Sequence, residues 1–314
     1  MDMTAIILSI LGLCLFEVVS SIDNAVVNAD VLSTMSVKWR KWFLIWGIFF
    51  GVFMVRGLLP WFIVWMANPS VGPWGALTAS FSNDPQIQQA LEESAPPLLL
   101  GGGGFLIFLF FHWLFLEPKE FGLHVERFFS RQGVWFFAVV SVILSVIIRE
   151  ALKIDPMMAF AASIGSSVFF ITHGFKEHAA RVELELKNRH HLSDISKIMY
   201  LEILDATFSI DGVIGAFAFT MSVPLIILGN GLGAIVVRQL TIKGVDKIKQ
   251  YPYLKNGAMY SIFFLGMIMV TDSFGVHVPH YAAPIITFIV IGFFLFKSLK
   301  AAKQSPFKRG IDAR

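Results

Sequence analysis

The sequence has a single cysteine, Cys14, and lacks several common functional motifs. One cysteine excludes an intramolecular disulfide and a cysteine-rich zinc site. Neither a Walker-type phosphate loop nor a dinucleotide-binding fingerprint is present, so ATP is not the energy source within this chain. We therefore expect no enzyme activity and no tightly bound cofactor.

The N-terminus also lacks the basic segment with which a cleavable signal peptide begins. Its first apolar stretch carries two acids, Glu17 and Asp23. We therefore expect no cleavable leader and interpret this stretch as a membrane span.

Apolar residues are abundant. They make up 56% of the 314 residues, Phe occurs 32 times, and the mean hydropathy is +0.70. A soluble domain has about 45–50% apolar residues, so this excess indicates a bilayer. The fold class that we expect is an all-α polytopic membrane protein with about nine spans, since about 20 apolar residues cross the hydrocarbon. These spans lie at about residues 4–27, 42–66, 96–116, 133–151, 156–172, 198–220, 223–238, 256–272 and 283–298. The tight turn between the fourth and fifth spans leaves a range of seven to nine open.

Positive charge is distributed very unevenly over the expected loops. Of the 25 Lys and Arg residues, 22 fall in the loops of one side and in the C-terminal tail, Arg149 and Lys153 fall on the other side, and Arg56 lies inside the second span. Lys and Arg mark the cytoplasmic side. We therefore expect a plasma (inner) membrane protein with its N-terminus outside and its C-terminus in the cytoplasm. The 68–95 loop is then external, the 173–197 loop is cytoplasmic, and the basic tail attracts anionic lipid.

Two acid motifs occur at matched spacing in the first and sixth spans. Each has an acid, three residues, and then Ser-Ile-Asp; the motif residues are Glu17, Ser21, Ile22 and Asp23 in the first and Asp205, Ser209, Ile210 and Asp211 in the sixth. The next span of each half repeats a second pattern, with Gly47, Gly51 and Arg56 spaced like Gly229, Gly233 and Arg238. These matches indicate an internal duplication. The Gly-x-x-x-Gly pairs are typical of close helix contacts in lipid.

The matched spans are five helices apart, so they cross the membrane in opposite directions. This predicts an inverted repeat of spans 1–3 and 6–8, which in transporters places the substrate near the midplane between the repeats. We expect one domain over 1–314, with repeat one at about 1–116, linker spans and a cytoplasmic loop at 117–197, repeat two at 198–272, and the last span with its tail at 273–314.

The motif carboxylates lie in apolar runs, where a charge costs about 2.5–3.5 kcal/mol on insertion scales. Ion pairing alone is the plainer interpretation, but Arg56 and Arg238 cannot neutralise four carboxylates. Glu202 adds a fifth acid. Carboxylates together with Ser and Asn oxygens suit hard or borderline divalent cations. The candidate metal ligands are Glu17, Ser21, Asp23, Asn24, Asp205, Ser209 and Asp211, and the supporting residues are Asn28, Glu202, Arg56, Arg238 and Asn230.

Six residues separate the two acids of a motif, about 9 Å along a helix, so one straight helix cannot place both on one ion. Either the helices break, near Asp23–Asn24 and Asp211–Gly212, or acids of both halves converge. Gly212 favours a break, since glycine tolerates non-helical dihedrals. We expect Asp23 and Asp211 to approach each other in an acidic cavity with Glu17 and Asp205.

For Asn230 a helix–helix hydrogen bond is the default expectation. His112 and Asp272 either line the pathway or lie at the interface, and His190 and His191 fall in a solvated loop.

These motifs resemble those of the TerC family of integral membrane proteins. The 253–257 stretch and the 230–238 segment are similar to its second half, and the long outer loop is similar to an uncharacterised branch, a domain of unknown function in the LysE transporter superfamily. The resemblance implies tellurium-ion resistance or manganese export, with Glu17, Asp23, Asn24, Asp205 and Asp211 as metal-binding positions. Gly212 departs from the Ser that many relatives carry.

Three functional hypotheses follow. The first is export of a divalent cation, Mn²⁺ before Ca²⁺, with exchange for protons. The second is a small-solute or amino-acid exporter of the LysE type, although the carboxylates would repel an amino-acid carboxylate. The third is a membrane scaffold in metal or tellurite stress. The expected partners are the lipid bilayer and divalent metal ions, without nucleic acid, and a homodimer stays open.

Overall fold

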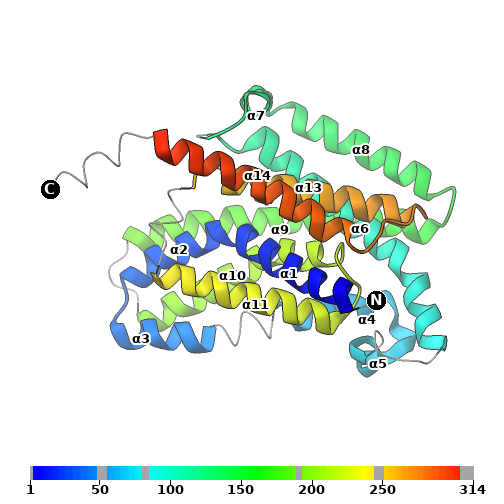
Figure 1. Ribbon diagram of the computed structural model, residues 1–314, viewed down its shortest axis with the longest axis horizontal. Helices are drawn as coiled ribbons and strands as arrows, with labels where there is room; N and C mark the ends of the chain where they lie inside the picture. Colours follow the sequence, from blue (N-terminus) through cyan, green and yellow to red (C-terminus); the bar gives the residue numbers. More distant parts are fainter. Residues whose placement is uncertain are drawn as a thin grey trace.

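The computed structural model describes residues 3–47, 55–78, 85–119, 121–188, 193–243 and 251–304, and the regular secondary structure in these ranges is helical (Figure 1). Some side chains within these helices, including those of Asp23 and Asn24, lie outside the description. The elements are α1 (Met3–Ser20), α2 (Ile22–Ser33), α3 (Val37–Trp42), the π-helix η1 (Phe43–Gly47), α4 (Leu58–Ala67), the 3₁₀ helix η3 (Pro69–Val71), α5 (Gly72–Thr78), α6 (Pro85–Leu116), α7 (His124–Phe129), α8 (Trp135–Ala151), α9 (Pro156–Asn188), α10 (Asp194–Ala216), α11 (Val223–Lys243), α13 (Leu254–Ser273) and α14 (Ala282–Gln304).

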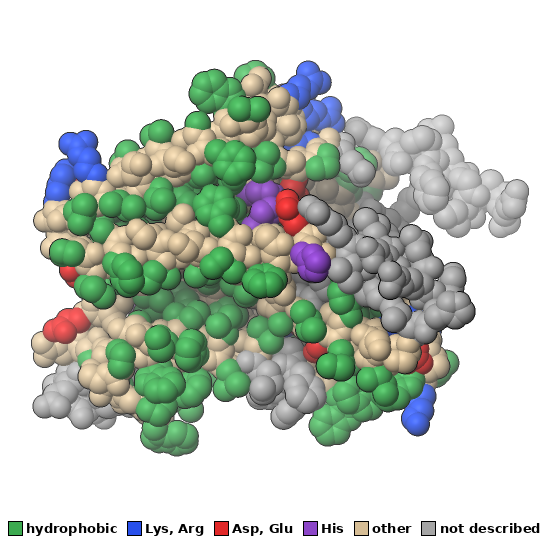
Figure 2. Space-filling view, turned by 180° about the vertical axis from the view of Figure 1, so that it is seen from behind, with side chains coloured by type: hydrophobic (Ala, Val, Ile, Leu, Met, Phe, Trp, Pro, Cys, Tyr) green, Lys and Arg blue, Asp and Glu red, His purple; other side chains and the backbone are tan. Residues whose placement is uncertain are grey.

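Six described helices are long and apolar enough to cross a membrane: α1, α11, α13, α14 and parts of α6 and α9. Hydrophobic side chains are spread over the face in Figure 2, and the Lys and Arg side chains lie at its periphery. The chain is therefore a multi-pass membrane protein. Helices also occupy the fourth and sixth expected spans, where α8 has 17 residues and α10 carries several charged side chains.

The second expected span, 42–66, is not one regular helix in the residues that the structure describes. After α3 the chain forms η1, and it resumes beyond the undescribed residues 48–54 with a turn at Arg56 and Gly57 before α4. Pro60 stands in the first turn of α4. Proline fits the first turn of a helix, where its missing N–H costs no intrahelical hydrogen bond, so it is compatible with a new helix start at Leu58.

The first acid motif breaks its helix and the second does not. α1 ends at Ser20 and α2 begins at Ile22, so the break lies at Ser21, just before the expected Asp23–Asn24. The break expected at Asp211–Gly212 is wrong, because α10 continues to Ala216. A Cβ on Gly212 would come 2.8 Å from Glu17 Oε2. This glycine therefore permits close approach between α10 and α1.

The α1–α2 pair runs antiparallel to α10. The Phe16 ring in α1 lies 5.9 Å from that of Phe219, just beyond the end of α10. Beyond the end of α2, Ser36 Oγ donates to Asp194 Oδ2 at 2.6 Å, at the start of α10. In Figure 1, α1 begins at the same end of the molecule as α5, and α14 ends near the opposite end, where α3 lies.

The principal helix contacts join α6 to α13 and α9, and α1 to α11. Glycines permit the second of these contacts: a Cβ on Gly229 would lie 2.6 Å from Leu13 Cβ, and one on Gly233 would lie 2.6 Å from Glu17 Cβ. The close-packing role expected for this glycine pair is confirmed. Gly51 lies outside the described residues.

We expect Gly233→Ala to lower the thermal stability of the purified protein in detergent, because the added methyl group forces α1 away from α11 at Glu17. Overpacking of this kind costs about 1–3 kcal/mol. Gly292→Ala in α14 is the matched control, since a Cβ there meets nothing within 4 Å. Equal unfolding temperatures for the two variants would show that this contact is not tight.

Candidate cation site at the paired acid motifs

Arg56 joins the first acids of the two motifs. Its Nη2 and Nε lie 2.7 and 2.9 Å from Glu17 Oε1, and its Nη1 lies 3.1 Å from Asp205 Oδ2. The three side chains are buried, with exposed fractions of 3%, 1% and 9%. Ser21 Oγ also donates to Glu17 Oε1, at 2.7 Å, instead of capping α2. Acids from both motifs thus converge, on an arginine that the sequence analysis had not placed between them.

Asp211, the last acid of the second motif, is paired with a lysine from a different helix. Lys176 Nζ in α9 lies 2.5 Å from Asp211 Oδ2. On the sequence alone, only two arginines faced the buried acids, and Lys176 fell in the expected cytoplasmic loop 173–197. The first part of the 173–197 segment, expected as a loop, is instead the continuation of α9 to Asn188, which carries Lys176 to α10. The site therefore contains a third cation.

Arg238 occupies the position in the second half that Arg56 occupies in the first. Its Nη2 lies 3.9 Å from Glu202 Oε1, and its Nη1 donates to the backbone oxygen of Phe43 at 2.9 Å. The guanidinium carbon also stacks 4.2 Å from the Phe43 ring centroid. A Cβ on Gly47 would meet Glu202 and Arg238, so this glycine leaves room for the pair.

Several buried oxygens have no hydrogen-bond partner among the described residues. They are Asn28 Oδ1, Glu202 Oε1, Asp211 Oδ1 and Asn230 Oδ1, and Asn230 Nδ2 is unpaired as well. The helix–helix hydrogen bond expected of Asn230 is therefore absent from the part of the chain that the structure describes. These side chains stand on α2, α10 and α11, which pack against one another. Buried oxygens without donors are available to a bound cation or to water.

The remaining predicted ligands either bond within their own helix or have side chains outside the described residues. Ser209 Oγ donates to the backbone oxygen of Asp205, so its own oxygen is bonded within α10. The Asp23 and Asn24 side chains lie outside the description, as do His190 and His191, so the expected approach of Asp23 to Asp211 stays a prediction. Within the described ranges, no group of three or more His, Cys, Asp or Glu residues has the geometry of a metal site.

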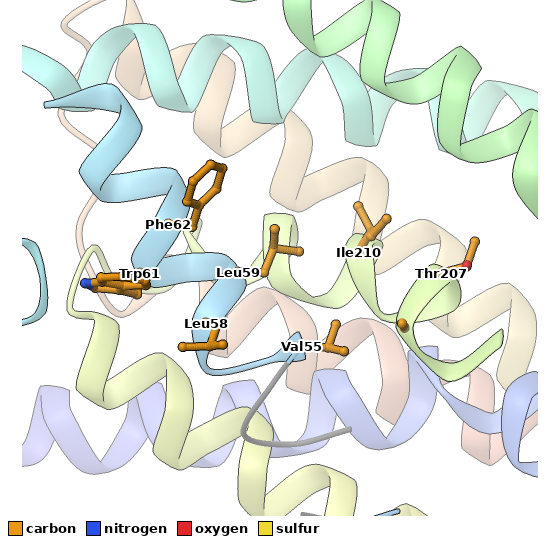
Figure 3. Close-up of a pocket in the computed structure, with 8 residues that line it drawn as sticks. Val55, Leu58, Leu59, Trp61, Phe62, Thr207 and Ile210 are labelled. Carbon is orange, nitrogen blue, oxygen red and sulfur yellow. The ribbon is translucent and has the colours of Figure 1, made fainter. Parts of the chain in front are cut away.

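An apolar cleft of about 500 Å³ lies beside this cluster, between α4 and α10 (Figure 3). Its lining is Val55, Leu58, Leu59, Trp61, Phe62, Ala206, Thr207 and Ile210. Val55 is next to Arg56 in the chain, and Ala206 is next to Asp205, so the cleft borders the ion pair that joins the two motifs. Its apolar lining offers a cation no charged ligand.

His112 and His173 lie next to each other, a contact that the sequence did not predict. His112 in α6 is buried, and its ring centroid lies 3.7 Å from that of His173 in α9. His173 Nε2 in turn lies 3.3 Å from Glu177 Oε1. Nothing in the sequence links positions 112 and 173, and His173 had been assigned to a loop. The other candidate, Asp272, accepts from the backbone of Val278 at 3.5 Å at the end of α13.

The 253–257 stretch that resembles the TerC family contributes to a polar network that joins the start of α13 to α7 and to the end of α6. Asn256 donates to the fully buried Glu126 at 2.7 Å, and Lys255 pairs with Glu117 at 2.7 Å. Nearby, burial against the Trp113 ring lowers the pKa of Lys119 to about 8, because desolvation disfavours its charged form. These contacts hold α7 and the end of α6 against α13, outside the acid motifs.

A family profile matches residues 22–305, which is nearly the whole chain, and its description is "Protein of unknown function (DUF475)". The chain belongs to this family. The expectation of a family defined by a domain of unknown function is thereby confirmed. The profile takes in α2 and every later helix, hence both acid motifs except Glu17 and Ser21.

Two curated relatives are membrane or uncharacterised proteins. "Uncharacterized membrane protein YceF" of Bacillus subtilis is 28% identical over 83 residues, which are 26% of this chain and 32% of that protein. A "UPF0053 protein" of Haemophilus influenzae is 28% identical over 103 residues, 32% of this chain and 42% of that protein. The matches thus span less than half of these relatives. No solved structure matches the chain.

Proposed function

We propose that this DUF475 protein is a transporter that exports divalent metal cations, Mn²⁺ first and Ca²⁺ second, in exchange for protons. The cation would bind at the paired acid motifs between two inverted repeats of a nine-span, TerC-like domain. The single observation that carries the proposal is the set of buried oxygens without hydrogen-bond donors on α2, α10 and α11, beside carboxylates from both motifs.

The inverted repeat is supported by equivalent contacts in the two halves. The glycines of α11 pack against α1, and the corresponding Gly47 packs against Glu202 in α10. The motif helices run antiparallel, as an inverted repeat requires. Arg56 bonds acids of both halves, and Arg238 donates to the backbone of Phe43 in the first half, with Glu202 Oε1 at an ion-pair distance of 3.9 Å.

The two other candidate functions make different demands on the site. An amino-acid exporter needs a group that binds the substrate carboxylate, yet Arg56 is already bonded to two protein acids. A scaffold needs no buried polar site at all, and burying polar groups without partners is costly. Both facts favour a cation as the substrate.

The test is transport by the purified chain in proteoliposomes, with Mn²⁺, Ca²⁺, Mg²⁺ and Zn²⁺ offered in turn. We expect Mn²⁺ flux above that of empty liposomes, with Ca²⁺ second, and proton movement in the opposite direction. Cells that lack the protein should accumulate Mn²⁺. Absence of flux for all four ions, with normal folding, would leave the solute exporter and the scaffold as the remaining candidates.

The proposed orientation makes its own prediction. A tag fused after Arg314 should be protected from external reagents in intact cells, because the basic side of the membrane is cytoplasmic. A tag at Ser82 should be accessible. The structure supports two opposite sides, since α5 and the end of α14 lie toward different ends of the molecule (Figure 1). External labelling of the C-terminal tag would reverse the orientation.

A further inference from the structure

The two oxygens of the Asp211 carboxylate have different surroundings. Lys176 Nζ lies 2.5 Å from Asp211 Oδ2, and the two side chains are 14% and 13% exposed. Asp211 Oδ1 is buried and has no hydrogen-bond partner among the described residues. One oxygen of the motif aspartate is thus held by a lysine, and the other is left for a different ligand.

Lys176 is directed at Asp211 by the packing of α9 against α6. His173 lies one turn earlier on α9, stacked on Phe169 with ring centroids 5.9 Å apart and against His112 at 3.7 Å. These contacts fix the rotation of α9, so that Lys176 points to α10. In Figure 2, histidine and acidic side chains lie next to each other near the middle of the face.

We propose that Lys176 is a tethered counter-cation, which neutralises Asp211 in the absence of substrate and which the transported divalent cation must displace. This inference rests on the proposed function and concerns the same site. An ammonium group and a divalent cation compete for one carboxylate and repel each other, so they do not occupy it together. A tethered group competes at high effective concentration.

Lysine suits this role and Arg56 does not. The lysine ammonium is a single charge on a flexible four-carbon chain with rotatable donors, so it can leave the carboxylate. Arg56 is fixed by bonds to both Glu17 and Asp205. Lys176 also comes from α9, outside the two predicted repeats, so it can move without disturbing their interface. Its displacement would set the cation affinity of the site.

Removal of the lysine charge should therefore raise cation affinity. If Lys176 holds Asp211 for nine-tenths of the time, its loss strengthens binding by about tenfold. The variant is Lys176→Gln, and the matched control is Lys153→Gln. Lys153 also lies 2.5 Å from a carboxylate, that of Glu150, but this pair is exposed and far from the motifs in sequence.

The experiment is equilibrium binding of Mn²⁺ to the purified full chain in detergent. We expect Kd about tenfold lower for Lys176→Gln and unchanged for Lys153→Gln. An equal or higher Kd for Lys176→Gln overturns this inference. The proposed function is still supported in that case if the wild-type chain binds Mn²⁺ and Asp211→Asn does not. If wild type binds no Mn²⁺, or Asp211→Asn binds it equally well, the proposed function fails at this site.

A second measurement uses the wild-type chain, so it does not depend on the folding of a variant. Amine acylation by acetic anhydride is followed at individual lysines by mass spectrometry, with and without saturating Mn²⁺. Displacement predicts that Mn²⁺ accelerates acylation of Lys176 severalfold and leaves Lys153 unchanged. If Lys176 is acylated at the same rate with and without Mn²⁺, the inference is wrong.

Discussion

Replacement of Arg56 by Met is expected to cause the largest loss of stability of any single substitution in this chain. It leaves the buried carboxylates of Glu17 and Asp205 without the guanidinium that bridges them. Removing one partner of a buried ion pair costs about 3–5 kcal/mol, because the remaining charge is uncompensated. We expect low yield and a much lower unfolding temperature in detergent, measured by fluorescence-detected thermal unfolding and size-exclusion chromatography.

Two further variants identify charge as the cause. Arg149→Met removes an arginine whose side chain is 77% exposed and lies 3.9 Å from Glu150, and it should leave the unfolding temperature unchanged. Addition of Glu17→Gln and Asp205→Asn to Arg56→Met should restore much of the stability, because all three groups are then neutral. Failure of this triple variant to improve on Arg56→Met would contradict the assignment of Arg56 as the neutralising partner.

Helix positions were predictable because the bilayer demands long apolar runs. α9, α11, α13 and α14 lie where hydropathy placed spans. The second span was the exception, since hydropathy does not register a π-helix or a new helix start at Leu58. The break predicted at Gly212 failed for a related reason. A glycine can allow a helix to break, or it can allow another helix to approach closely. At Gly212 the nearby Glu17 side chain shows that close approach is the reason, and the sequence does not reveal this contact.

The acids of the site were predictable and their partners were not. Buried carboxylates are conspicuous in an apolar run, so Glu17, Asp205 and Asp211 stood out. That Arg56 bridges two of them, and that Lys176 reaches the third, depends on contacts between positions more than 30 residues apart. A charge count that stopped at two arginines therefore overstated the uncompensated negative charge.

The second large effect is expected for Asp211→Asn, which should reduce Mn²⁺ transport to the level of empty liposomes. The substitution keeps the size and an acceptor oxygen but removes the negative charge that attracts a divalent cation. Hard cations bind carboxylates far better than neutral amides, and their affinity follows the number of charged ligands. The measurement is Mn²⁺ flux in proteoliposomes containing equal amounts of folded protein. Glu150→Gln, which removes the acid of the exposed pair with Lys153, is the control and should transport normally.

Loss of transport must be separated from loss of folding, because Asp211→Asn leaves the largely buried Lys176 without this partner. The double variant Asp211→Asn, Lys176→Gln removes both charges of this pair together. Insertion and unfolding temperature close to those of wild type are expected, together with transport that is still at background, whereas Lys176→Gln alone should bind Mn²⁺ more tightly than wild type. If instead the double variant transports Mn²⁺ as fast as wild type, the Lys176–Asp211 pair is a structural ion pair, and the cation passes through the membrane without using the second motif's last acid.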